Sequence, residues 1–215
     1  MNTKTKRLAM LGLFSAFAYV LTAFVRIPIS SVEFLKYDPK DIIIVILGFI
    51  SGPVSAFAVA VVSSLVEAIT VSTTGIIGFI MNVLSTSTFA CTASIIYKKK
   101  RTLGGAVLGL ISGVILTCGV MLLWNYLVTP FHMGVAREIV TSMLLPVFLP
   151  FNLIKGSINA ALAMLLYKPV VKALKSTKLM EGTESKSDVK FSVIAICVLV
   201  LLSSILGILI VKGII

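Results

Sequence analysis

Residues 103–128 read LGGAVLGLISGVILTCGVMLLWNYLV and contain no charged side chain. Folded as an α-helix, a stretch of this length extends about 39 Å, whereas the hydrocarbon core of a bilayer is about 30 Å thick. The stretch is therefore long enough and apolar enough to cross a membrane. It predicts a membrane-spanning helix and sets the fold class of the chain.

Other apolar runs of the same kind occur along the chain, separated by short polar segments. Only 13% of the 215 residues are charged, about half the share of an ordinary soluble domain. We therefore expect an all-α membrane protein with six or seven spans, in which the second run is short and tilted or broken. The additional runs cover residues 8–25, 41–50, 53–69, 75–97, 139–167 and 191–211.

The spacing of these runs predicts three parts. Residues 1–175 form a six-span unit, residues 176–190 are a polar cytoplasmic linker, and residues 191–215 hold an extra C-terminal transmembrane helix. The last helix has no charge within its apolar run and is attached by a polar tether, which favours a peripheral position.

Basic residues predict the orientation of the spans. With the N-terminus in the cytoplasm, thirteen Lys and Arg residues fall in inner segments and five in outer segments. This distribution agrees with the positive-inside rule. The net charge of +11 is thus explained by topology, and we expect membrane lipid around the chain and no nucleic acid as partner.

Several function classes lack the residues that they need. The chain has no phosphate-binding loop motif for ATP, no His, Cys and acidic cluster with metal-ligand spacing, and no serine–histidine–acid set. We therefore expect neither an enzyme nor a bound cofactor. Carboxylates within the apolar runs are nearly absent, which disfavours a proton relay. A transporter of this composition would take its energy from a partner.

Small residues indicate where helices approach each other closely. Gly105, Gly109 and Gly113 are four residues apart on one run, and Gly12 and Ala16 repeat the spacing on the first run. Such ridges allow close packing of membrane helices. Each ridge can serve internal packing or the docking of a partner membrane protein.

Lys155 is the most unusual polar residue, since it lies midway along an apolar run. A lysine at the centre of a membrane helix costs about 2.5–3.5 kcal/mol on insertion scales and marks a candidate functional site. Asn152 and Asn159 share its helical face. Pro146 and Pro150 precede this polar stripe and should kink or break the helix there.

Other polar side chains join this stripe by their predicted position: two lie near the outer ends of spans, one lies within a span and one lies in an outer loop. They suggest an outward-facing pocket with aromatic neighbours, suited to a planar, hydroxyl-rich solute. Glu67 is a possible ion-pair partner of Lys155, and hydrogen bonds between helices remain an alternative role for the asparagines. The residues concerned are Asp38, Glu67, Asn82 and Asn125.

Four segments resemble a known family in colinear order over residues 7–175. They are similar to the riboflavin-specific substrate-binding subunit (S component, RibU type) of energy-coupling-factor (ECF) transporters. The PFNxxKG pattern together with Asn125-Tyr126 is fairly specific to it, whereas the Gly52-Pro53 turn is general to such subunits. The segments are FLKYDPKD (34–41), GFISGP (48–53), LWNY (123–126) and LPFNLIKG (149–156).

The resemblance implies a six-helix S-component fold in a prokaryotic plasma membrane, with riboflavin bound near the outer face for uptake. It implies a transmembrane coupling subunit with two cytosolic ATPases, docked at Gly12 and Ala16. FMN is a second candidate ligand, because Lys155 could meet a phosphate. Implied ligand contacts are Asn125, Asn152 and Lys155, with Leu35, Tyr37, Asp38 and Asn82 as weaker candidates.

Three alternatives stay open at this point. The scaffold could bind another vitamin, the chain could be a self-sufficient secondary transporter, or it could be a membrane-embedded enzyme. A secondary transporter would need inverted repeats and a coupling carboxylate, and an enzyme would need a nucleophile or metal set. Neither requirement is clearly met by the sequence.

Overall fold

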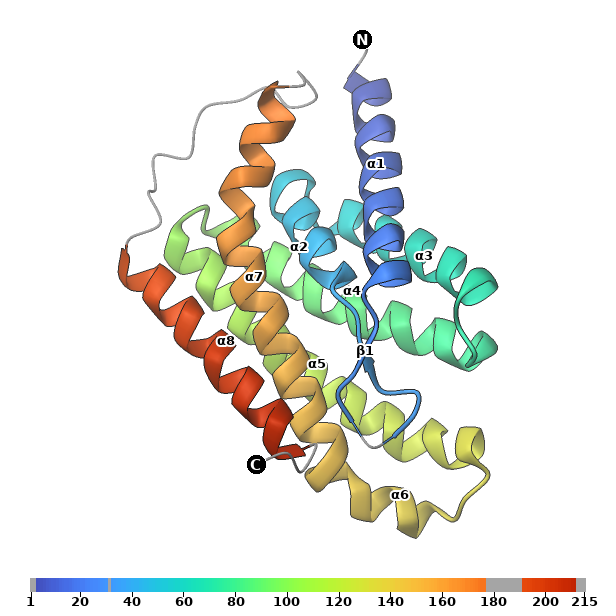
Figure 1. The fold of residues 1–215 in the computed structure, drawn as a ribbon. Helices are drawn as coiled ribbons and strands as arrows, with labels where there is room; N and C mark the ends of the chain where they lie inside the picture. Colours follow the sequence, from blue (N-terminus) through green and yellow to red (C-terminus); the bar gives the residue numbers. More distant parts are fainter. Residues whose placement is uncertain (1–2, 31, 177–190, 212–215) are drawn as a thin grey trace.

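The computed structural model describes residues 3–30, 32–176 and 191–211, and these residues are almost entirely helical (Figure 1). A short antiparallel ribbon, β1 (Ile27–Pro28) with β2 (Lys36–Tyr37), connects the first two helices. The helices are α1 (Thr3–Phe24), α2 (Lys40–Ser51), α3 (Pro53–Thr70), α4 (Gly75–Lys99), α5 (Leu103–Met133), α6 (Arg137–Met143), the π-helical turn η1 (Leu144–Phe148), α7 (Leu149–Ser176) and α8 (Phe191–Val211).

The prediction of an all-α membrane protein is confirmed. Among the residues that the structure describes, five stretches are long and apolar enough to cross a bilayer, and they comprise α1, α3, α4, α5 and the continuous run of α6, η1 and α7. Large apolar side chains such as Leu8, Phe24 and Ile76 are exposed on the outside of these helices. Exposed side chains of this kind are suited to contact with lipid tails.

Helix α2 is an interior helix of the bundle. Its 12 residues extend about 18 Å, which is too short to cross the hydrocarbon core. Nine consecutive residues, Lys40 to Gly48, are buried, because α2 packs against α1, α3, α4 and α7. The turn into α3 uses Gly52 at φ 88°, a conformation that favours glycine. The short second run is thus enclosed by other helices.

The glycine ridge of α5 packs inside the bundle. A Cβ atom at Gly109 would lie 2.6 Å from the Ala93 carbonyl oxygen, and one at Gly113 would lie 2.8 Å from that of Phe89. Both neighbours belong to α4, so only glycine permits this approach of the two helices. Of the two roles open for this ridge, the structure shows internal packing.

The predicted break near Pro146 is the π-helical turn η1, which joins α6 to α7. Neither Pro146 nor Pro150 has a backbone N–H to donate along the helix. The wider turn accommodates both prolines while the chain continues as one long helical run. The start of α7, which carries Asn152 and Lys155, therefore follows a segment with an irregular backbone.

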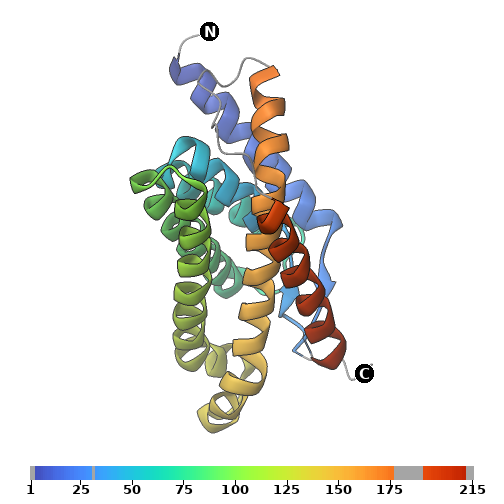
Figure 2. The same cartoon turned by 90° about the vertical axis from the view of Figure 1, so that its left-hand side faces the viewer.

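Helix α8 lies along α7 in both views (Figures 1 and 2), and the two helices are in contact. The sequence favoured a peripheral helix. In the described residues α8 packs against α7 and buries Cys197 and Ser204, while most of its large apolar side chains stay exposed. The proposed linker, residues 176–190, lies outside the described residues except at its first position.

Candidate functional site

An open cavity with a volume of about 50 Å³ lies between the β1–β2 segment, the α3–α4 loop, α4, α5 and α7. Its wall combines apolar and aromatic side chains with amides and charged groups. The lining residues are Arg26, Phe34, Leu35, Lys36, Asp38, Ser72, Thr73, Thr74, Met81, Asn82, Ser85, Met121, Phe151, Asn152 and Lys155.

Five of the seven residues that the sequence suggested as ligand contacts line this cavity: Leu35, Asp38, Asn82, Asn152 and Lys155. The amide nitrogen of Asn152 donates to the Phe148 carbonyl oxygen at 2.7 Å, which holds the side chain against η1. The β1–β2 segment, α4 and α7 thus bring together residues that are more than a hundred positions apart in sequence.

Asn125 and Tyr37 lie beside the cavity without being part of its lining. Asn125 is fully buried; its amide nitrogen donates to the Met121 carbonyl at 2.6 Å, and its oxygen accepts from Thr129 at 2.8 Å. Tyr37 donates to Asn159 at 3.0 Å. Burial chiefly raises the pKa of the Tyr37 hydroxyl, so it keeps its proton for that bond. Both stay predicted ligand contacts.

Lys155 is paired with two carboxylates. Its ammonium nitrogen lies 3.4 Å from Asp41 Oδ2 and 3.6 Å from Asp38 Oδ2. Asp41 also accepts from Thr86 at 2.6 Å and from Asn159 at 3.1 Å. The polar stripe of α7 therefore connects to α2 and α4, and the costly lysine is compensated by buried partners.

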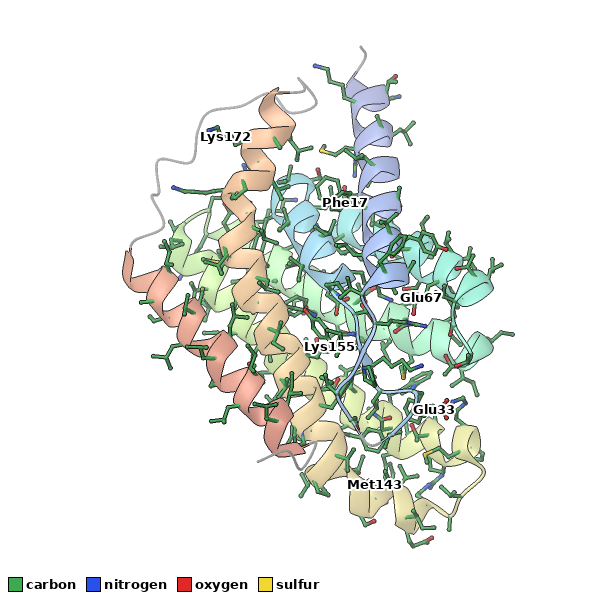
Figure 3. The ribbon with its side chains drawn as sticks, viewed as in Figure 1. Phe17, Glu33, Glu67, Met143, Lys155 and Lys172 are labelled. Atoms are coloured by element: carbon green, nitrogen blue, oxygen red, sulfur yellow. The ribbon has the colours of Figure 1, made fainter. Side chains whose placement is uncertain are left out.

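Glu67 of α3 is the centre of a second group of contacts. It accepts from Arg26 and Lys40, and Asn82 donates to it at 3.1 Å. Figure 3 places Glu67 and Lys155 on either side of the segment that joins α1 to α2. The suggested direct pair of Glu67 with Lys155 is wrong, because Lys40 and Arg26 occupy the Glu67 carboxylate and Asp38 and Asp41 lie nearer to Lys155.

The two groups form one charge network, since Lys40 lies 4.0 Å from Asp38 and contacts Glu67. Three cations and three carboxylates balance within it, and burial is costly unless charges are paired in this way. Two of its buried atoms, Asp38 Oδ1 and Arg26 Nε, have no hydrogen-bond partner. The network consists of Arg26, Asp38, Lys40, Asp41, Glu67 and Lys155.

Asp38 stays ionised at neutral pH. Burial by itself raises the pKa of its carboxyl, but Lys155, Lys40 and Arg26 outweigh burial and hold the pKa below the ordinary value of 3.8. A carboxyl with a lowered pKa stabilises the fold above its ordinary pKa, and this contribution is lost as the pH falls through the folded-state value. The unpartnered Oδ1 is therefore a buried anionic acceptor beside the cavity.

Among the residues that the structure describes, no group of His, Cys, Asp and Glu side chains is arranged to hold a metal ion. The acidic side chains of the site are instead occupied by Lys and Arg. The site can thus bind a ligand by stacking and hydrogen bonding, with no resident ion needed to explain its carboxylates.

The chain matches a known protein family. A sequence model of the family "ECF transporter, substrate-specific component" matches residues 6–167, about three quarters of the chain. The chain belongs to this family. As an S component it is a transporter subunit for substrate binding and not an enzyme.

Curated relatives of this S component are flavin transporters by name. It is 31% identical to "Riboflavin transporter RibU" of Staphylococcus aureus, over 80% of this chain and 94% of the relative. It is 28% identical to the RibU of Streptococcus thermophilus (78% and 84%) and 24% identical to "Riboflavin transporter FmnP" of Bacillus subtilis (76% and 91%).

A solved structure shares the fold. It is described as the S component of a bacterial ECF transporter, with a TM-score of 0.69 and 32% identity. The match covers 99% of that chain but 80% of this one. The family match ends at residue 167, so α8 lies beyond the part of this S component that matches the family model.

Sequence reasoning missed three members of the charge network. Arg26 and Lys40 are two of the five basic residues that the charge count places in outer segments, yet Lys40 is fully buried at the start of α2. The expectation that carboxylates are nearly absent from the apolar runs was also wrong for this region, because Asp41 and Glu67 are both buried in helices. The dense charges of the 34–41 segment were the available signal, because such residues beside an apolar run need partners once they are enclosed.

Proposed function

We propose that this S component captures riboflavin at the outer face of the membrane and delivers it to an ECF coupling module for ATP-driven uptake. The observation that carries the proposal is the mixed cavity, which joins apolar and aromatic walls to a buried amide and ion-pair cluster in a member of the S-component family. The names of three curated relatives support riboflavin as the ligand class.

The cavity suits a flat, polar-edged ring. Phe34, Phe151 and Met121 offer apolar surface for a planar ring system, while Asn82 and Asn152 add amide groups at the wall. The unpartnered Asp38 Oδ1 is an acceptor for an N–H or O–H, and Arg26 Nε is a donor for a carbonyl. An isoalloxazine ring with a ribityl chain supplies groups of all these kinds.

The charge network favours the neutral vitamin over its phosphate ester. FMN carries about −1.5 to −2 charges at neutral pH. Lys155, the residue suggested for the phosphate, is already paired with Asp38 and Asp41. A phosphate beside Lys155 would thus approach two carboxylates that already hold this cation, so riboflavin should bind more tightly than FMN there. Lys36 also lines the cavity and lies outside the charge network, so it is the cation that a phosphate would have to reach.

The energy source and the docking partner belong to the proposal as well. The sequence lacks a phosphate-binding loop motif, so ATP would be hydrolysed by partner ATPases acting through a transmembrane coupling subunit. Gly12 and Ala16 lie on the exposed side of α1, and a Cβ atom at Gly12 would meet nothing within 4 Å. This open surface supports docking there, with the N-terminus of α1 in the cytoplasm.

The test is a binding titration of the purified full-length protein in detergent. We expect a visible flavin spectrum in the purified protein, or quenching of riboflavin fluorescence on addition of the colourless form. FMN should compete more weakly. Protein that is colourless and leaves flavin fluorescence unchanged would overturn the ligand assignment and return the question to another vitamin on the same scaffold.

A further inference from the structure

Helix α8 has two different sides. Large apolar side chains, among them Leu199 and Leu202, are exposed. The side that packs against the bundle carries small residues together with the partly buried Val200, Leu201 and Ile208. Small residues let membrane helices approach closely. Helix α8 therefore combines a close approach with apolar packing on this side. The small residues are Cys197, Ser204 and Gly207.

The close approach of α8 falls next to the ligand cavity. A Cβ atom at Gly207 would lie 3.3 Å from Ile154 Cδ1, and Ile154 directly precedes Lys155. The next residue, Ile208, packs against an apolar cluster that contains Phe151 and Leu35. Both of these residues line the cavity. The end of α8 therefore supports the wall of the cavity from behind.

The part of α7 that α8 contacts begins beside an irregular backbone. It follows the π-helical turn η1, and Pro146 and Pro150 cannot donate helical hydrogen bonds. A helix bends most readily at such a point. The start of α7 lacks some of the backbone hydrogen bonds of a regular helix. Packing against Gly207 and Ile208 therefore restrains a segment that would otherwise bend more easily.

We propose that α8 is a brace, which holds the outer end of α7 in the position where Phe151, Asn152 and Lys155 face the cavity. The match to the ECF family ends before α8, so this brace is an addition to the S-component unit. The part of the inference that concerns ligand binding rests on the proposed function. Its consequence is slower release of the captured ligand.

The experiment uses Gly207→Leu in the full-length protein, reconstituted in lipid nanodiscs. The larger side chain should push α8 away from α7. Without ligand, amide hydrogen exchange over residues 144–158 should become about two- to thirtyfold faster. Riboflavin should also dissociate faster by a similar factor. Gly207→Ala, whose methyl group would meet Ile154 at 3.3 Å, should change both rates in the same direction by a smaller factor.

Two variants separate bracing from general damage. Gly119→Leu on α5 adds the same bulk where a Cβ would meet nothing within 4 Å, so it should leave both rates unchanged. Ile154→Ala combined with Gly207→Leu makes room for the new side chain and should restore the exchange rate. Exchange over 144–158 that is equal in wild type and both Gly207 variants overturns the brace. Because exchange is read without ligand, a wild type that binds no flavin would refute only the proposed function.

Discussion

Lys155 carries a buried charge that is costly to place in a membrane helix and that holds two carboxylates in place. Its charge lies within a helix that is otherwise apolar, and two carboxylates from outside that helix compensate it. Removing one partner from a buried, hydrogen-bonded charge pair leaves the others uncompensated. Lys155 therefore connects the cavity wall on α7 to the segment that carries Asp38 and to α2, which carries Asp41.

Lys155→Met keeps the length of the side chain and removes its charge. We expect the Kd for riboflavin to rise roughly thirtyfold or more, equivalent to about 2 kcal/mol, because Asp38 and Asp41 lose their shared cation. Lys172→Met on the exposed side of the same helix is the control and should bind as wild type does. Titration by fluorescence quenching measures both, and equal affinities would exclude Lys155 from the site.

Asp38→Asn tests ligand selection at a single atom. The substitution keeps an oxygen acceptor but leaves the charge network with one excess positive charge. The ratio of the Kd for FMN to that for riboflavin should therefore fall about tenfold, equivalent to ~1.4 kcal/mol. Glu33→Gln makes the same charge change at an exposed position of the same segment. If the ratio of the two Kd values falls equally in both variants, the cause is general electrostatic attraction of FMN to a more positive protein and not the Asp38 site.

At the scale of elements, α1 has an exposed side that the S component itself does not use for packing. Gly12 and Ala16 lie on this side, so added bulk there should leave the fold and the cavity intact. For Gly12→Leu with Ala16→Leu we expect an unchanged Kd for riboflavin but at least about tenfold less co-purification with the coupling subunit. Gly119→Leu on α5 is the control. If the double variant co-purifies with the coupling subunit as well as the wild type does, the docking surface lies elsewhere.

Most elements could be predicted from the sequence, because a long uncharged run has few structural alternatives in a bilayer. Residues 103–128 are recognisable in this way, and so is the break at Pro146. The enclosed position of α2 could not be predicted, since hydropathy reports how apolar a run is and not what surrounds it. The packing of α8 on α7 was missed for a related reason: the spacing of Cys197, Ser204 and Gly207 carries no sign of which helix it faces.

At the scale of the whole molecule, the charge network joins parts that hydrophobic packing alone would leave independent. Glu67 on α3 contacts Arg26 from the loop, Lys40 from α2 and Asn82 from α4. These pairings span sequence separations of 15 to 41 residues. A single sequence does not reveal which acid meets which base over such distances, although it revealed Asn82, Asn152 and Lys155 as candidates for one site.

Glu67→Gln should destabilise the entire bundle. It leaves Lys40, which is fully buried, without its nearest carboxylate, and breaking a buried pair in this way costs about 3–5 kcal/mol. Thermal unfolding in detergent should show a clear drop in melting temperature. The exposed Glu33→Gln should change stability by less than about 0.5 kcal/mol. Adding Lys40→Met to Glu67→Gln should recover part of the loss, and a double variant less stable than the single one would contradict this account.

The balance of the charge network has an electrical consequence. A charge that moves through the full transmembrane voltage gains or loses about 2.3 kcal/mol per 100 mV. Three cations and three carboxylates that travel together sum to zero, and riboflavin adds no charge to them. Any movement of the loaded site across the bilayer would therefore need no electrical work from this network, so these six residues should add no dependence of the uptake rate on the membrane potential.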